Sequence, residues 1–209
     1  YDTIIGVSKS VAEGLNRQIK HKDITYIDNA ICFSRLDTYE KISLRDNENQ
    51  KVVLMAGWPA LVKGVDIAAQ AILELRNDGC DIKLCIMQSG DFEQTQHCVT
   101  EAIGSYPDWV EILQPREDVA TYYNAADIFL SASRTEAFSY CLVEAAYCTP
   151  MLITSDIPGP SDLKIDGMER FVSENVEDLV HKIKELLIIS IDVEERKYNV
   201  IRLYDLRSW

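Results

Sequence analysis

Short apolar runs alternate with helical segments along most of this chain of 209 residues. The runs at 51–57, 82–88, 109–113, 127–133 and 150–155 are typical of buried strands, and amphipathic segments separate them. Two further helices are predicted at 175–187 and 192–207. Strands that alternate with helices form a parallel sheet, and right-handed crossovers cover both of its faces. We therefore predict an α/β fold with a doubly wound, Rossmann-like parallel sheet.

The first 50 residues differ from this pattern. Residues 1–30 contain a strand, a helix and a second strand, "TIIGVSKSVAEGLNRQ" followed by "ITYIDNAI", which do not obviously belong to the main sheet. The polar, turn-rich segment 36–50 is expected to lead into the main domain. The sequence therefore predicts a separate N-terminal segment, 1–45, and a main domain, 46–209.

Composition excludes several classes of function. The net charge of −13 disfavours a nucleic-acid binder and a protein that binds anionic membranes. No apolar run approaches the ~20 residues that a membrane-spanning helix needs. The six cysteines form no C-x-x-C pair and indicate free thiols in a reducing, cytoplasmic compartment. The three histidines lie far apart in the sequence, so no metal site is predicted.

A ligand is expected beyond the carboxyl ends of the strands, because open parallel sheets bind ligands at the point where the strand order reverses. The segments that follow three of the strands are "MAGWPALVKG", "QSGD" and "SASRTEAFS". None of them contains G-x-G-x-x-G or G-x-x-x-x-G-K-[ST], which disfavours an NAD-dependent dehydrogenase and a P-loop NTPase.

The stretch "SRTEAFSYCLVEAAYCTP" suggests what the ligand is. A helix is expected to begin near Phe138, and its first N–H groups form a natural site for a diphosphate. Glu136 precedes this helix and Glu144 lies within it, and each carboxylate can accept bonds from a sugar or ribose diol. Lys63, after the first strand of the main domain, suits a phosphate. Taken singly, these residues are also compatible with ordinary solvated side chains.

The same stretch resembles the E-x7-E segment of retaining GT-B glycosyltransferases of family 4, the "glycosyl transferases group 1" domain. "AGWPALVKGVDIAAQAI" is similar to the G-R-x(4)-K-G-x-D segment of that family. "LQPREDVATYYNAADIFLSAS" is similar to its loop, helix and strand before the motif. "VSKSVAEGL" and "YIDNAI" resemble the end of the N-terminal half of such enzymes, so 1–45 would be the end of that half and an interdomain linker.

The resemblance implies a site for a nucleoside-diphosphate sugar linked to UDP, GDP or ADP, with no cofactor and no metal. Glu144 would hold the ribose hydroxyls and Glu136 the donor sugar. Lys63, in the loop that begins at Gly57 and Trp58, would neutralise phosphate charge in the leaving group.

Two further groups would complete the site by analogy with the family. The backbone N–H groups around Phe138, Ser139 and Tyr140 would bind the distal phosphate. The loop of Gln114, Pro115 and Arg116 would lie against the base. The expected reaction retains the configuration of the anomeric carbon, and Glu136 is assigned as a group that positions the sugar, not as a nucleophile.

The chain departs from the family pattern in two ways. Trp58 stands where the family usually has arginine, so a bidentate phosphate contact is lost unless Arg116 or Arg134 replaces it. Trp58 itself could either pack the loop or stack on a ligand. In addition, the chain looks like a donor domain of a longer enzyme, with the glycan or lipid-linked acceptor bound mainly by the N-terminal half.

Two expectations follow from this resemblance. The isolated chain should bind a nucleoside diphosphate weakly and turn over little. The N-terminal element and the last helix should lie near each other, because each has lost its usual partner. Two alternatives remain open, namely a non-catalytic sugar-nucleotide-binding or interaction module with the same fold and another GT-B member such as a sugar-nucleotide epimerase.

Overall fold

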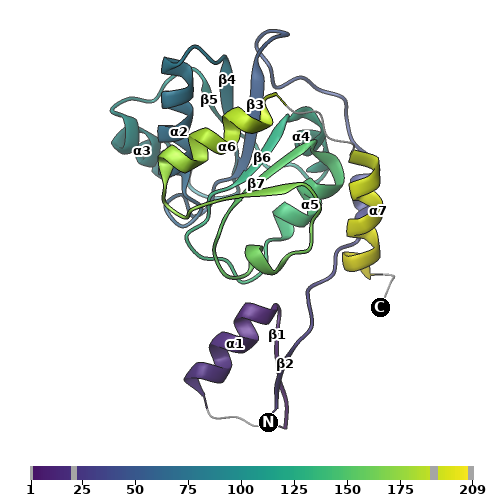
Figure 1. Ribbon diagram of the computed structural model, residues 1–209. Coiled ribbons are helices and arrows are strands. Elements are labelled where there is room, and N and C mark those ends of the chain that lie inside the picture. The colour runs from purple at the N-terminus through teal and green to yellow at the C-terminus, as the bar shows by residue number, and fades with distance from the viewer. Residues whose placement is uncertain (1, 20–22, 189–192, 207–209) are drawn as a thin grey trace.

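The computed structural model describes residues 2–19, 23–188 and 193–206. Its centre is a parallel sheet of six strands in the order β5-β4-β3-β6-β7-β8 (Figure 1). The strands are β3 (Lys51–Ala56), β4 (Ile82–Met87), β5 (Val110–Leu113), β6 (Ile128–Ser131), β7 (Met151–Ser155) and β8 (Met168–Phe171). The doubly wound parallel sheet predicted from the sequence is confirmed.

Helices cover both faces of this sheet, and each face has its own buried apolar cluster. One face is covered by α2 (Val65–Asn77), α3 (Phe92–Ile103) and α6 (Val176–Leu186). The other is covered by α4 (Ala120–Ala125), α5 (Tyr140–Cys148), α7 (Val193–Tyr204) and the 3-10 helix η1 (Phe33–Leu36). The interior strands are apolar on both sides because both sides are buried.

The strand β8 was missed by the sequence reasoning, which placed no strand between 155 and 175. β8 pairs with β7 over four residues at the edge of the sheet. Its middle residues, Glu169 and Arg170, are only partly buried or exposed. An edge strand with a polar centre carries no continuous apolar run, so the pattern used for the other strands does not detect it.

The strand order reverses between β3 and β6. From β3 the chain proceeds outward to β4 and β5, and from β6 it proceeds in the opposite direction to β7 and β8. The loops after β3 and β6 therefore diverge at the carboxyl end of the sheet and leave a crevice between them. Both loops carry residues that the sequence singled out.

The N-terminal element forms a small sheet of its own, as the sequence suggested. Strands β1 (Ile4–Gly6) and β2 (Ile24–Tyr26) pair in parallel, with α1 (Lys9–Gln18) between them in the chain. The element lies below the main sheet in Figure 1. It contacts the main domain where the N–H of Ser10, at the start of α1, donates to Asp162 Oδ2 at 2.7 Å.

The segment after β2 also contacts the end of the last helix. The N–H of Ile31 donates to the carbonyl oxygen of Tyr204 at 2.7 Å, and the N–H of Leu206 donates back to Ile31 at 2.9 Å. The expected proximity of the N-terminal element and the last helix is therefore seen at Ile31, in the segment that follows β2.

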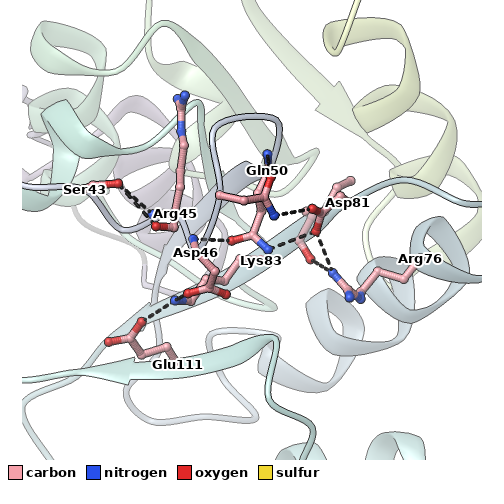
Figure 2. A network of polar contacts seen from close by, with 10 residues as sticks. Ser43, Arg45, Asp46, Gln50, Arg76, Asp81, Lys83 and Glu111 are labelled. Atoms are coloured by element: carbon pink, nitrogen blue, oxygen red, sulfur yellow. Dashed lines mark hydrogen bonds and ion pairs between the residues drawn. The ribbon is translucent and has the colours of Figure 1, made fainter.

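A polar network fixes the linker to the end of the sheet where the strands begin, opposite the crevice (Figure 2). Lys83 of β4 donates to Asp46 and Glu111 at 2.8 Å each. Burial lowers the pKa of Lys83, but these two bonds outweigh it, so the pKa is raised. Gln50 and Asn47 donate to Asp81 at 2.9 and 2.8 Å. Residues 46–50 are thus held at the amino ends of the strands.

The helix α7 supports α5 through one buried arginine. The guanidinium of Arg196 donates to the carbonyl oxygens of Ala146, Thr149 and Pro150, at and just beyond the end of α5. Cationic side chains at this end of a helix satisfy its unpaired carbonyl groups. Because α5 carries Glu144, the packing of α7 contributes to the placement of the site.

Candidate functional site

A pocket of about 310 Å³ opens at the carboxyl ends of β3, β4 and β5. It is lined by Ala56, Gly57, Trp58, Lys63, Met87, Gln88, Ser89, Gln114, Pro115, Arg116, Val119, Tyr122, Tyr123, Cys141 and Glu144. A larger pocket, of about 550 Å³, lies between α2, α3 and loop 59–62. We take the smaller one as the site because it lies at the topological switch point and collects charged groups from several elements.

The loop after β3 places Lys63 at this pocket. It ends at Gly64, which precedes α2 in a left-handed conformation with φ of 69°. A Cβ atom at Gly64 would lie 2.1 Å from the carbonyl oxygen of Ala132. Only glycine lets the loop approach the end of β6 this closely. Lys63 is thereby brought next to the segment that leads into α5.

The N-terminus of α5 faces the same crevice. The helix begins at Tyr140, two residues later than predicted, with Ser139 as its N-cap residue. Its first intrahelical bond runs from the N–H of Val143 to the carbonyl oxygen of Ser139 at 3.2 Å. The N–H groups before Val143 therefore have no acceptor within the helix. Ser139 and Lys63 line one small recess together. The charge of Lys63 and the positive end of the α5 dipole therefore lie next to each other.

The three residues predicted around the distal phosphate have different environments. Phe138 is buried, and its ring packs edge-on against the rings of Tyr140 and Tyr204. Ser139 is buried, and its side chain makes no capping bond to α5. Tyr140 is 48% exposed. Any contact of Phe138 with a phosphate would therefore come from its backbone, as the sequence reasoning assumed.

Glu136 and Lys63 form an ion pair through Lys63 Nζ and Glu136 Oε2. Both side chains are mostly buried. The residue expected at the sugar and the residue expected at the phosphate are thus in direct contact. A donor bound between them would have to replace at least part of this pair by its own contacts.

Glu144, the fifth residue of α5, lies buried in the wall of the pocket. Its Oε2 accepts a bond of 2.9 Å from the hydroxyl of Tyr123, and its Oε1 is paired with Arg35 Nη2. Burial raises the pKa of Glu144, while Arg35 and the bond from Tyr123 lower it and only partly offset the burial. Burial likewise raises the pKa of Tyr123, which keeps its hydroxyl a donor.

Gln114 and Arg116 form the side of the pocket at the end of β5. The carbonyl oxygen of Gln114 accepts a 2.8 Å bond from Tyr122, and the Arg116 guanidinium lies over the Tyr122 ring. Arg116 also donates twice to Asp118 and once to Glu40. Its bonds to these carboxylates raise the pKa of Arg116. Arg116 therefore lines the pocket with its charge already paired.

Arg134 does not line the pocket and instead holds the loop that carries Lys63. Its guanidinium makes a bidentate contact with Asp66 at 2.9 and 2.7 Å and also binds Glu174 and the carbonyl oxygen of Leu61. The sequence reasoning considered Arg116 and Arg134 as replacements for the arginine absent at 58. The structure shows both guanidinium groups engaged with carboxylates.

Trp58 packs against the neighbouring loop and also lines the pocket. A Cβ atom at Gly90 would lie 2.3 Å from Trp58 Cε2, so the indole lies directly on the backbone of that glycine. Gly57 is equally confined, since a Cβ atom there would lie 2.1 Å from a methyl group of Ile86. The loop-packing role considered for Trp58 is thus present in the structure.

Three residues of the site were missed by the sequence reasoning. Gln88 follows β4 directly, in the segment "QSGD" that was already recognised as a strand end. Arg35 belongs to η1 in the linker, and Tyr123 belongs to α4. No sequence signal marks Arg35 or Tyr123, because their contacts with Glu144 span 109 and 21 residues.

In the part of the chain that the structure describes, no group of three or more histidine, cysteine, aspartate or glutamate side chains could hold a metal ion. No helix within the same residues is long and apolar enough to cross a membrane.

Comparison with known protein families identifies the domain. Residues 50–188 match the model of the family described as glycosyl transferases group 1. The chain belongs to this family. The match covers β3 through α6, and thus the loop of Lys63, the segment of Glu136 and the helix of Glu144.

Curated relatives include the phosphatidylinositol N-acetylglucosaminyltransferase GPI3 subunit of Saccharomyces cerevisiae, at 24% identity over 98% of this chain and 48% of the relative. An uncharacterized glycosyltransferase of Methanocaldococcus jannaschii, MJ1178, is 26% identical over 89% of this chain and 50% of its own length. The chain spans about half the length of these two relatives.

Solved structures share the fold. A glycosyltransferase from Rickettsia africae superimposes with a TM-score of 0.81 at 20% identity, over 99% of this chain and 60% of the other. Anabaena HepE, solved with UDP and glucose, gives a TM-score of 0.81 at 16% identity over the same shares. The doubly wound sheet together with its N-terminal element is therefore an arrangement known from these solved structures.

Proposed function

We propose that this chain is the donor-binding half of a glycosyltransferase that transfers a sugar from a nucleoside diphosphate without a metal and with retention of configuration. One observation carries the proposal. Lys63, Glu136 and Glu144 all lie around the N-terminus of α5, at the switch point of the sheet. We also propose a domain boundary near residue 45, because the six-stranded sheet begins with β3 at Lys51.

The donor would bind along the row of strand ends. The diphosphate would lie between Lys63 and the first N–H groups of α5, where side-chain charge and helix dipole both favour an anion. The ribose would bind Glu144, whose carboxylate accepts hydroxyl hydrogens. The base would then extend toward Gln114 and Arg116.

The diphosphate leaving group requires positive charge from the protein. When the bond between the anomeric carbon and the diphosphate oxygen breaks, the electron pair stays on the diphosphate. Lys63 and the N-terminus of α5 are placed to stabilise that charge. Glu136 would exchange its contact with Lys63 for hydroxyl groups of the sugar and so hold the ring in place.

The names of the relatives indicate which donors to test first. The GPI3 subunit is named as an N-acetylglucosaminyltransferase acting on phosphatidylinositol, and HepE was solved with UDP and glucose. We therefore propose a UDP-linked hexose or N-acetylhexosamine as donor and a glycan or lipid-linked acceptor bound largely by residues outside this chain. We propose a cytoplasmic location because the six cysteines are free thiols.

A second candidate is a non-catalytic sugar-nucleotide-binding module. It is favoured by one observation: the residues that the structure describes place no unpaired arginine at the proposed diphosphate site. Trp58 replaces the arginine expected there, and Arg116 and Arg134 are bound to carboxylates. Lysine alone offers no bidentate contact with a phosphate.

Titration calorimetry with UDP, GDP and ADP tests the proposal. We expect weak but measurable binding of at least one nucleotide by the 209-residue chain. Absence of binding to all three would refute it. Transfer from the matching nucleotide sugar by a longer form that includes the acceptor half, compared with its Glu136→Gln variant, distinguishes an enzyme from a binding module. A module would bind the nucleotide but show no turnover in either form.

A further inference from the structure

The buried side chain of Gln88 has no hydrogen-bond partner. Among the residues that the structure describes, three buried side-chain polar atoms lack a partner, and two of them are Oε1 and Nε2 of Gln88. The third, Thr95 Oγ1, lies within α3 and not in the wall of the pocket. Gln88 is 4% exposed. Proteins rarely bury an unpaired amide, because its lost hydration is not replaced.

Gln88 lies where a bound nucleotide would extend. It follows the last residue of β4 and lines the pocket together with Gln114, which follows β5. The proposed diphosphate contacts are at the other side of the pocket, at the ends of β3 and β6. Because the strand order is β5-β4-β3-β6, the row of strand ends runs from the proposed phosphate site past Gln88 to Gln114.

The backbone around Gln88 is held in place. The carbonyl oxygen of Met87 accepts a bond of 2.9 Å from the N–H of Gly57, which joins the ends of β4 and β3. The indole of Trp58 lies on Gly90, two residues after Gln88. The residue that replaces the arginine of the family motif thus fixes the turn that carries Gln88.

The chemistry of the amide selects among the parts of a nucleotide. A glutamine side chain offers a donor and an acceptor side by side. A diphosphate offers only acceptors and would leave Oε1 unpaired, and the ribose hydroxyls are already assigned to Glu144. A nucleobase edge carries donor and acceptor groups in one plane and satisfies both atoms of the amide.

We propose that Gln88 recognises the nucleobase of the donor through a paired contact with its side-chain amide. The proposal rests on the proposed function, because it requires a nucleotide in this pocket. It also gives Trp58 a role in the site, namely the packing that positions Gln88.

The test compares the wild-type chain with its Gln88→Met variant. Methionine has a similar size and no hydrogen-bonding amide, so the fold should persist. We expect the affinity for the preferred nucleotide among UDP, GDP and ADP to fall about tenfold or more, and the affinities for the three to converge. Binding of inorganic pyrophosphate, which has no base, should not change. The melting temperature should rise, because an unpaired buried amide has been removed.

Other outcomes separate this proposal from the function on which it rests. If the wild type binds none of the three nucleotides, the proposed function fails. If the wild type binds and Gln88→Met binds with the same affinity and the same preference, the role of Gln88 is refuted. An equal loss for nucleotide and pyrophosphate would also refute it. Gln88→Glu serves as second variant, because it keeps the length but offers only acceptors, and it should alter the preference among the bases.

Discussion

Replacing Glu144 with glutamine tests the ribose assignment with little change of shape. Glutamine keeps an oxygen that can accept the bond from Tyr123, but its amide nitrogen cannot accept from Arg35, so the variant removes the negative charge together with the ion pair. The variant therefore tests the contribution of the carboxylate charge, including its pair with Arg35, to nucleotide binding and to stability. It avoids the cavity and the unpaired Tyr123 hydroxyl that alanine would leave.

The size of the binding effect follows from the number of bonds that Glu144 can make. A hydrogen bond to an ionised group contributes about 1.5–3 kcal/mol, and a neutral one about 0.5–1.5 kcal/mol. The difference is about 1 kcal/mol per bond, so two ribose hydroxyls correspond to about 2 kcal/mol, or roughly a 30-fold higher Kd. Titration calorimetry with UDP measures this value. Glu101→Gln, at an exposed position on α3, is the matched control and should leave the Kd unchanged.

The same variant makes a prediction for stability as a function of pH. Burial raises the pKa of Glu144 in the folded state, so folding favours the protonated carboxyl. Its stabilising contribution is complete below the unfolded value of 4.5 and is lost as the pH rises through the folded pKa. Glu144→Gln, which stays neutral, should match the wild type near pH 4 and be more stable at pH 7. Melting curves from pH 4 to pH 8 measure the difference.

Two results would refute the reasoning. An unchanged Kd for UDP would show that the ribose does not bind Glu144. A variant that is less stable than the wild type by the same amount at every pH would show that the charge is not penalised by burial. In that case the ion pair with Arg35, whose side chain is 48% exposed, would contribute more than such pairs usually do.

Three further variants test neighbouring contacts. Glu136→Gln frees Lys63 from its ion pair and should strengthen binding of UDP without a sugar, because the phosphates no longer compete with the Glu136 carboxylate for Lys63; weaker binding in calorimetry would contradict this. Arg134→Lys loses the bidentate contact with Asp66 and should lower the free energy of unfolding in urea by about 2 kcal/mol; full stability would show that the contact is dispensable. Arg196→Met leaves three carbonyl groups without their donor and should cost about 3 kcal/mol, which corresponds to a melting temperature lower by roughly 6–12 °C. An unchanged melting curve would show that α7 does not support α5.

Much of the fold could be predicted because its signals are local. The apolar runs that form β3 and β4 stand out in the sequence by themselves, and α3 and α6 each begin with a capping side chain, Asp91 and Asn175. The edge strand β8 escaped because a strand with one neighbour and a polar centre needs no apolar run.

The residues of the candidate site were likewise predictable where their signal is local. Lys63, Glu136 and Glu144 were recognised because each belongs to a motif with a short spacing in the chain. Their location around one crevice could be expected only in outline, from the rule that strand ends meet at one edge of a parallel sheet. Nothing in the spacing predicted that Lys63 and Glu136 form an ion pair in this state.

By itself, the sequence determined the doubly wound sheet, the positions of the loops at its carboxyl edge and the glutamates around α5. Hydrophobic patterns and capping residues act over a few neighbouring positions, so they can be recognised in the sequence itself. The tertiary structure alone decided that Arg35 of the linker pairs with Glu144 and that Trp58 lies on Gly90. It also decided that the Gln88 amide is buried without a partner. These features depend on which distant segments pack together, and packing is set by the whole core rather than by any local pattern.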